Sequence, residues 1–237
     1  MSSLEKGLMI LEEIASRNAG VLQSDIVNSL NYPKSSVSQI INSLVDMGYL
    51  LYNNSTRKYK CSLKIVSLAS HIIDNFEFRN VAHEFLQDLH DRTNYTCHLG
   101  ILNENQDAGL YIDKIESKSY NIRLFSDIGK EFPLTCTALG KVLISFMELP
   151  KREEIFSRKL IAFTPNSITK KSVLKKEIEN TKKNGYAIDN EEITRGVICV
   201  AAPVINYRNE AVAAVSMSFP SFESSEIFLK NAVKLVK

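Results

Sequence analysis

The stretch Tyr32–Leu44, YPKSSVSQIINSL, has a proline at its start and two chemically different sides. Its apolar residues recur at the spacing of one face of an α-helix, and they are Val37, Ile40, Ile41 and Leu44. We therefore predict a helix that begins near Lys34 and ends at Gly48, since glycine suits the left-handed position after a helix. The side chains that remain on the outer side are Lys34, Ser35, Ser36, Ser38, Gln39 and Asn42. The alternative is a polar face that only meets solvent.

Two further helices precede this stretch and a hairpin follows it. Ser2 and Glu5 have the spacing of a capping box, which marks the start of a helix. The predicted elements are this first helix, which stops before Asn18, a second helix over residues 23–30, and strands over 49–52 and 58–61 around a polar turn at 53–56. Three helices followed by a hairpin is the element order of a winged helix-turn-helix domain.

The rest of the chain changes from helices to a mixture of strands and helices. Its predicted helices cover 63–75, 80–92, 137–147, 151–157, 171–184 and the C-terminus, and its predicted strands cover 96–102, 109–115, 121–125, 197–205 and 211–219. This order predicts an α+β domain with an antiparallel sheet flanked by helices. We expect a winged helix-turn-helix domain at 1–62, a linker helix at 63–77 and an α+β domain at 78–237.

The composition of the 237 residues is that of an ordinary globular protein, with 44% hydrophobic and 24% charged residues. No apolar run reaches the roughly 18 residues that a membrane-spanning helix needs, and the N-terminus carries acids instead of a basic secretory signal. We therefore expect a cytoplasmic protein with no membrane partner. Its four cysteines are scattered without a C-x-x-C pair, which favours buried, reduced thiols over a metal site or disulfides.

The small positive charge of the chain is concentrated in its first part. Residues 1–70 contain seven Lys and Arg against five Asp and Glu, whereas residues 71–237 contain 22 of each. Residues 26–70 carry one acid, Asp46, and five basic residues, which are Lys34, Arg57, Lys58, Lys60 and Lys64. This local excess lies where a polyanion would meet the predicted winged domain.

Two blocks of sequence resemble the IclR-type bacterial transcriptional regulators. The first block joins LNYPKSSV at residues 30–37 to LVDMGY at 44–49. The second block consists of TALGK at 137–141, GYAIDNEE at 185–192, GVICVAAPV at 196–204 and AVSMS at 214–218. The resemblance runs along nearly the whole chain. It implies a DNA-binding regulator, more often a repressor than an activator, whose GAF-like C-terminal domain binds a small metabolite and forms dimers or dimers of dimers.

A recognition helix in the major groove turns its N-terminal residues toward base edges and phosphates. We expect Lys34, Ser35 and Ser36 to bind phosphates of double-stranded operator DNA, and Arg57 and Lys58 to contact a flanking phosphate or the minor groove. We expect contacts with base edges from Ser38, Gln39 and Asn42. Many family members have an arginine where this chain has Gln39. Without that arginine, either affinity depends more on the second protomer or the operator is A/T-richer. Our hypothesis is that Gln39 reads a base, since its amide can bond to an adenine edge.

The resemblance also implies a ligand pocket in the C-terminal domain, with the residue at position 189 in a turn. The lining residues that it implies are Leu124, Ala138, Leu139, Asp189, Val197, Cys199, Ser216 and Ser218. Alternation along two strands supports the last four of these, because residues two apart share a face. Backbone amides at the start of the helix at 137–147 would take an anionic group of the ligand. The resemblance implies a small organic acid or sugar acid as the ligand, and two serines beside Asp189 suit a hydroxylated one.

The same residues have simpler interpretations. Cys199 could be an ordinary core residue, Asp189 could cap a turn, and the two serines could form the polar face of a half-exposed strand.

Two alternatives to transcriptional regulation are an enzyme and a sensor that binds protein. An enzyme would need Cys97 or Cys199 as a nucleophile beside a histidine, but Cys97 and His98 are neighbours on a strand and so point to opposite faces. The other reading is a sensor whose winged helix binds protein instead of DNA. We therefore predict a regulator without enzymatic activity, cofactor or metal.

Overall fold

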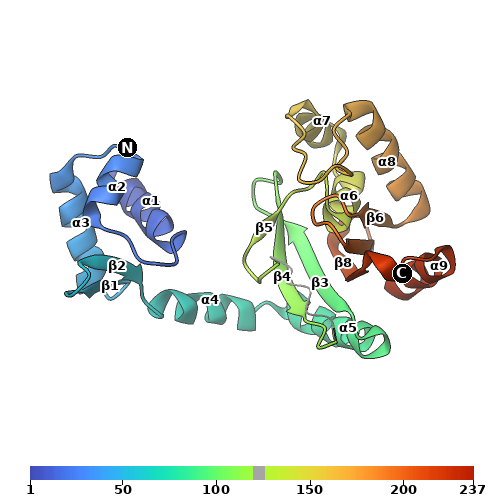
Figure 1. Cartoon of the computed structure of the whole chain (residues 1–237), viewed down its shortest axis with the longest axis horizontal. Helices are drawn as coiled ribbons and strands as arrows, with labels where there is room; N and C mark the ends of the chain where they lie inside the picture. The colour runs from blue at the N-terminus through green and yellow to red at the C-terminus, as the bar shows by residue number, and fades with distance from the viewer. Residues whose placement is uncertain (120–125) are drawn as a thin grey trace. The chain divides into compact units, whose positions relative to one another are not determined.

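The computed structural model describes residues 1–119 and 126–237, so the predicted strand at 121–125 and its Leu124 lie outside the described residues. The chain divides into two compact units, Met1–Phe76 and Glu77–Lys237. Figure 1 shows the elements of each unit. Among the described residues, no helix is both long and apolar enough to cross a membrane.

The first unit has the predicted order of three helices, a hairpin and a linker helix. Its elements are α1 (Ser3–Ala15), α2 (Gln23–Leu30), α3 (Lys34–Asp46), β1 (Leu50–Asn53), β2 (Lys58–Cys61) and α4 (Lys64–Asp74). The predicted capping box is present, since Ser2 Oγ accepts from the Glu5 amide and the Glu5 carboxylate accepts from the Ser2 amide. Gly48 has the expected left-handed conformation, with φ +77°. This is a winged helix-turn-helix.

One compact core holds the first unit together. It is formed by Ile10, Ile14, Val21, Ile26, Val37, Ile41 and Leu50, each of which is 2% exposed or less. The core therefore contains side chains from α1, α2, α3 and β1. In contrast, no residue of α4 is buried, although that helix is rich in apolar side chains.

The second unit is an α+β domain built on a six-stranded antiparallel sheet of order β5-β4-β3-β8-β7-β6. Its strands are β3 (Thr96–Leu102), β4 (Gly109–Ile115), β5 (Glu131–Phe132), β6 (Ala187–Asn190), β7 (Val197–Ile205) and β8 (Ala211–Pro220). Its helices are α5 (Glu77–Thr93), α6 (Ala138–Phe146), α7 (Leu149–Ser157), α8 (Lys171–Asn184) and α9 (Glu226–Val236), with a short 3₁₀ turn at Ser221–Glu223. Strands β5 and β6 were not predicted.

Helices cover both faces of this sheet (Figure 1), and each face has its own core. Leu86 and Leu89 of α5 and Ala232 of α9 pack on one face against Cys97, Leu99 and Met217. Helices α6, α7 and α8 cover the other face. A Cβ atom on Gly140 would lie 2.4 Å from the Leu134 carbonyl oxygen, so glycine permits the close approach of α6 to the preceding chain.

Asp189 corrects the sequence-based expectation of a turn. It lies in strand β6, directly opposite Cys199 of β7, and it is 1% exposed. The Asp-Asn pair at 189–190 is typical of turns, but here the pairing with β7 decides the conformation. The chain reverses only afterwards, in the loop at residues 191–196.

Candidate functional site

The two sides of α3 differ in burial as the sequence predicted. Val37 and Ile41 are fully buried, whereas Lys34, Ser35, Gln39 and Asn42 are exposed and Ser36 and Ser38 are half-buried. The helix begins directly after Pro33, and Pro33 offers no side-chain cap. The first amides of the helix and its polar side chains are therefore available to a partner.

A hollow of about 380 Å³ lies between α2, the start of α3 and the wing. Its lining includes Lys34 and Arg57, together with polar side chains of α2 such as Gln23 and Asn28. Arg57 has a left-handed backbone, with φ +56°, in the turn between β1 and β2. Lys58 is the first residue of β2 and is half-buried. The fold thus brings Lys34 and Arg57, 23 positions apart in sequence, to one concave basic surface.

The second unit contains a cavity of about 340 Å³ on the face of the sheet that α6 covers. Its lining residues are His98, Tyr111, Ser126, Thr137, Ala138, Leu139, Phe163, Asp189, Ile193, Thr194, Val197, Cys199, Ser216 and Ser218. Seven of the eight residues that the sequence singled out therefore surround one cavity. The eighth, Leu124, lies outside the described residues.

The register of the sheet places the polar residues of this cavity in two rows. Asp189 lies opposite Cys199, and Cys199 lies opposite Ser218. The Cys199 sulfur and the Ser218 hydroxyl are 3.0 Å apart. In the second row Ser216 lies opposite His98, whose Nε2 is 2.7 Å from the Ser126 hydroxyl. The floor of the cavity is a polar patch inside an otherwise apolar layer.

The start of α6 forms one wall of the cavity. The Thr137 hydroxyl accepts from the Gly140 amide at 3.0 Å and donates to the Pro133 carbonyl at 2.7 Å. The amides of Ala138 and Leu139 belong to the first turn, where the helix offers no acceptor, and both residues line the cavity. A helix N-terminus of this kind favours an anionic group.

Burial changes the acid strength of the groups that face the cavity. It raises the pKa of Asp189 to about 7, with the nearby charge of Glu192 adding to the effect. Burial and the charge of Lys114 lower the pKa of His98 to about 3, so this imidazole is neutral at pH 7. Burial likewise raises the pKa of the Cys199 thiol and of the Tyr111 hydroxyl.

The pattern of this chain matches two family models, one for each unit. The IclR helix-turn-helix domain matches residues 3–53, and the C-terminal domain of the bacterial transcriptional regulator IclR matches residues 70–237. The chain belongs to the IclR family of bacterial transcriptional regulators.

Relatives in this family align along almost their whole length. The regulator XynR of Escherichia coli is 33% identical over 92% of this chain and 86% of its own sequence. The regulator KdgR of the same species is 30% identical over 100% of this chain and 89% of its own sequence. Among solved structures, IclR of Thermotoga maritima is 31% identical with a TM-score of 0.77, and the alignment covers 99% of this chain and 94% of that one.

As an IclR-family member, the chain is a DNA-binding transcriptional regulator with an effector-binding C-terminal domain, and the family is not one of enzymes. The structure places Cys97, one of the two cysteines of the enzyme alternative, away from its neighbour His98. Cys97 lies in the core under α5 while its neighbour His98 lines the cavity on the opposite face. Burial raises the pKa of Cys97 to about 12, so this thiol is not a thiolate at neutral pH.

Sequence reasoning missed several residues of the cavity wall, including His98, Tyr111, Phe163 and Ile193. His98 and Tyr111 lie on two strands, β3 and β4, whose ranges were predicted correctly. What the sequence lacked was the pairing of β3 with β8, which brings His98 beside Ser216. The signal available in the sequence was His98 itself, a polar residue within the largely apolar predicted strand at 96–102.

Asp189 gives the stability of the second unit a specific dependence on pH. The pKa of its carboxyl is raised from 3.8 to about 7 on folding, so between these values the folded chain holds a proton that the unfolded chain has lost. The protonated carboxyl therefore contributes fully to the free energy of unfolding below about pH 4. This contribution is lost as the pH rises through about 7, and the free energy of unfolding then no longer depends on Asp189. The total loss is at most about 4 kcal/mol.

We expect Asp189→Asn to remove this dependence. The free energy of unfolding of the wild-type chain, measured with urea, will fall relative to that of the variant as the pH rises from about 4 to about 7. A constant difference across this range would contradict the raised pKa.

Proposed function

We propose that the chain is a repressor whose affinity for operator DNA is controlled by a small hydroxylated carboxylate, such as a sugar acid, bound in the cavity under α6. The observation that carries this proposal is the pairing of a helix N-terminus with two rows of polar side chains across one enclosed space. Two relatives support the sign of the regulation, because they are named as the transcriptional repressor IclR and the acetate operon repressor. As a regulator of bacterial genes, it acts in the cytoplasm.

The effector class follows from the distribution of polar groups around the cavity. The amides of Ala138 and Leu139 suit a carboxylate, while Ser216, Ser218 and Asp189 suit hydroxyl groups on the body of the ligand. Ser216 is 2% exposed, and its hydroxyl faces this space. A buried hydroxyl favours a ligand that bonds to it over one that leaves it unpaired. A homologue from Microbacterium hydrocarbonoxydans was solved with 4-hydroxybenzoate and shares the fold at 19% identity, with a TM-score of 0.85.

The operator contacts follow from the exposed side of α3 and from the hollow beside it. We assign Lys34, Ser35, Ser36, Arg57 and Lys58 to phosphates and the minor groove. We assign Ser38, Gln39 and Asn42 to base edges of the major groove. The basic hollow supports the first assignment, because it joins Lys34 to the wing residue Arg57. The exposure of Gln39 and Asn42 supports the second.

A homodimer, or a dimer of dimers, completes the proposed regulator. Helix α4 has 11 residues and none of them is buried, yet Val66, Leu68 and Ile72 are large apolar side chains with exposed fractions of 60%, 47% and 74%. A helix of this length is marginal on its own in water, so it needs a partner for its apolar face. A second copy of the chain supplies an identical helix and matches the two-fold symmetry of a palindromic operator.

The effector proposal is tested by calorimetry of the full chain with D-gluconate, pyruvate and 4-hydroxybenzoate. We expect D-gluconate to bind most tightly, and Ser216→Ala to weaken it about tenfold through the loss of one buried hydrogen bond. Ser145→Ala is the control, because it removes a buried hydroxyl of α6 that bonds to the Val142 carbonyl outside the cavity. Equal binding of all three acids would contradict the proposed class.

The base-reading role of Gln39 is tested with an operator selected from random DNA. Gln39→Ala should lower affinity for the selected operator by about tenfold and tolerate substitution at one base pair. Lys34→Ala should instead weaken all sequences alike and reduce the salt dependence of binding. A uniform loss for Gln39→Ala would assign Gln39 to the backbone and refute the hypothesis.

The dimer is tested by sedimentation of two α4 variants. Ile72→Glu places a charge on the apolar side of α4 and should convert the dimer to a monomer with weaker operator binding. Ser67→Glu places the same charge on the opposite side of the helix and should leave the mass unchanged. A monomeric wild-type chain would refute the assignment of α4 as an interface.

A further inference from the structure

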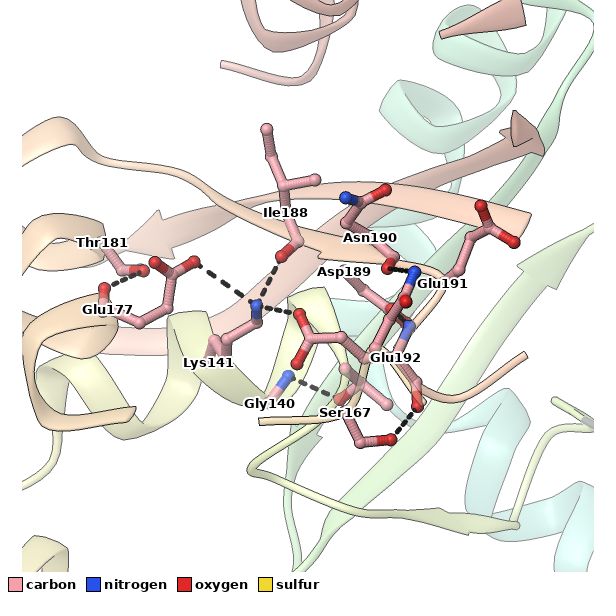
Figure 2. A network of polar contacts seen from close by, with 12 residues as sticks. Gly140, Lys141, Ser167, Glu177, Thr181, Ile188, Asp189, Asn190, Glu191 and Glu192 are labelled. Carbon is pink, nitrogen blue, oxygen red and sulfur yellow. Dashed lines mark hydrogen bonds and ion pairs between the residues drawn. The ribbon is translucent and has the colours of Figure 1, made fainter. Parts of the chain in front are cut away.

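Helix α6 carries a buried lysine next to the cavity but outside its lining. The side chain of Lys141 is 1% exposed. Its Nζ donates to Glu192 Oε1 at 2.5 Å and to the Ile188 carbonyl at 2.5 Å, and Glu177 Oε1 of α8 lies 3.4 Å away. Figure 2 shows these contacts converging on the ammonium group. Lys141 therefore connects α6 with α8, with strand β6 and with the loop at 191–196.

Glu192 connects this lysine to the cavity itself. Its amide donates to Asp189 Oδ1 at 2.7 Å, and its carbonyl accepts from the Ser167 hydroxyl at 2.5 Å. The next residue, Ile193, lines the cavity. One residue thus contacts the cavity carboxyl by its backbone and the buried ammonium by its side chain.

The Glu192 carboxylate is only half satisfied. Its Oε2 is buried without a hydrogen-bond partner among the described residues. A buried carboxylate in this state depends strongly on its ion pair, because removal of the partner leaves an uncompensated charge. The arrangement therefore requires Lys141 to stay beside Glu192.

Backbone conformation and polar contacts act together with the Lys141–Glu192 pair on the loop at 191–196. Glu191 and Gly196 both have left-handed backbones, with φ +58° and +79°, so the chain turns sharply out of β6 and back into β7. Side-chain contacts hold the loop, since the Thr164 hydroxyl donates to the Glu191 carbonyl at 2.6 Å and the Gly196 amide donates to Glu191 Oε2 at 2.6 Å. Polar contacts at its base thus set where Ile193 and Thr194 meet the cavity.

We propose that Lys141 and Glu192 are positioning residues of the effector site: their ion pair holds the Asp189 carboxyl and the loop at 191–196 in the arrangement that binds the effector. Neither residue lines the cavity, so both act through Asp189 and the loop. This inference rests on the proposed effector site.

The two residues act on Asp189 with opposite electrostatic signs. Asp189 is faced by Glu192 of the loop, Lys141 of α6, Cys136 ahead of α6, Cys199 of β7 and Tyr111 of β4. The charge of Glu192 raises the pKa of Asp189, and the charge of Lys141 lowers it. Loss of the Glu192 charge should therefore lower the pKa of Asp189, and loss of the Lys141 charge should raise it. Damage to the fold alone would not produce two shifts of opposite sign.

The test compares full-length wild-type chain with Glu192→Gln and Lys141→Met. Glu192→Gln removes the charge and keeps an oxygen that accepts from Lys141. Glu191→Gln is the matched control, because it removes a charge from the same loop and keeps an acceptor for the Gly196 amide. The measurements are the titration of the Asp189 carboxyl by NMR, amide exchange of residues 191–196, and calorimetry with D-gluconate from about pH 5 to about pH 9.

We expect Glu192→Gln to lower the pKa of Asp189 and Lys141→Met to raise it. An anionic ligand meets repulsion once Asp189 is ionised, so the pH at which D-gluconate binding weakens should move in the same two directions. At pH values where Asp189 is protonated in every variant, both variants should bind D-gluconate about tenfold more weakly and exchange the loop amides faster. Glu191→Gln should match the wild type in all three measurements.

Glu192→Gln with an unchanged Asp189 titration and unchanged amide exchange would overturn the proposal. If Lys141→Met does not fold, the comparison of Glu192→Gln with Glu191→Gln decides. If wild-type chain does not bind D-gluconate, the proposed effector class fails, while the titration and exchange measurements still support or refute the positioning role.

Discussion

The ion pair between Lys141 and Glu192 lies where both side chains are 5% exposed or less. Removing two charges from water costs more than their attraction commonly returns, so a pair of apolar side chains would serve stability at least as well. The pair instead fixes the relative position of the two elements that it joins. It connects α6, whose first turn forms a cavity wall, with the loop that follows Asp189. In the proposed effector site, the polar rows on the sheet bind a ligand only when that wall and that loop are held around them.

In the first unit, the polar side chains of the candidate interface are exposed to water instead of paired inside the protein. On α3 the buried side is wholly apolar, and the polar side, with Gln39 and Asn42, remains in water. These groups need no internal partners, so they remain free to exchange water for base edges and phosphates. In the cavity, by contrast, some polar groups pair inside the protein, since Cys199 bonds Ser218 and His98 contacts Ser126.

The sequence predicted those parts of the fold that local patterns determine. The ranges of β3, β4, β7 and α8 agree with the structure, because each has a clear hydrophobic period and a clear end signal. Two short strands were not predicted from the sequence, because β5 has only two residues and β6 contains an Asp-Asn pair that is typical of a turn. The positions of His98 and of the Lys141–Glu192 pair depend on strand order and on contacts across 51 positions of sequence, which no local pattern encodes.

For the proposed anionic effector, the raised pKa of Asp189 adds a further constraint on binding. A carboxylate at the start of α6 is best tolerated when Asp189 carries its proton, and by reciprocity the bound carboxylate raises the pKa of Asp189 further. Binding of the proposed effector near pH 7 then takes up a fraction of a proton, because Asp189 with a pKa of about 7 is only partly protonated there. Each tenfold preference for the protonated form corresponds to about 1.4 kcal/mol of coupling between proton and effector. Burial accounts for most of the raised pKa of Asp189, and the charges of Glu192 and Lys141 adjust it in opposite directions, so the pair also adjusts how much of that coupling is available at a given pH.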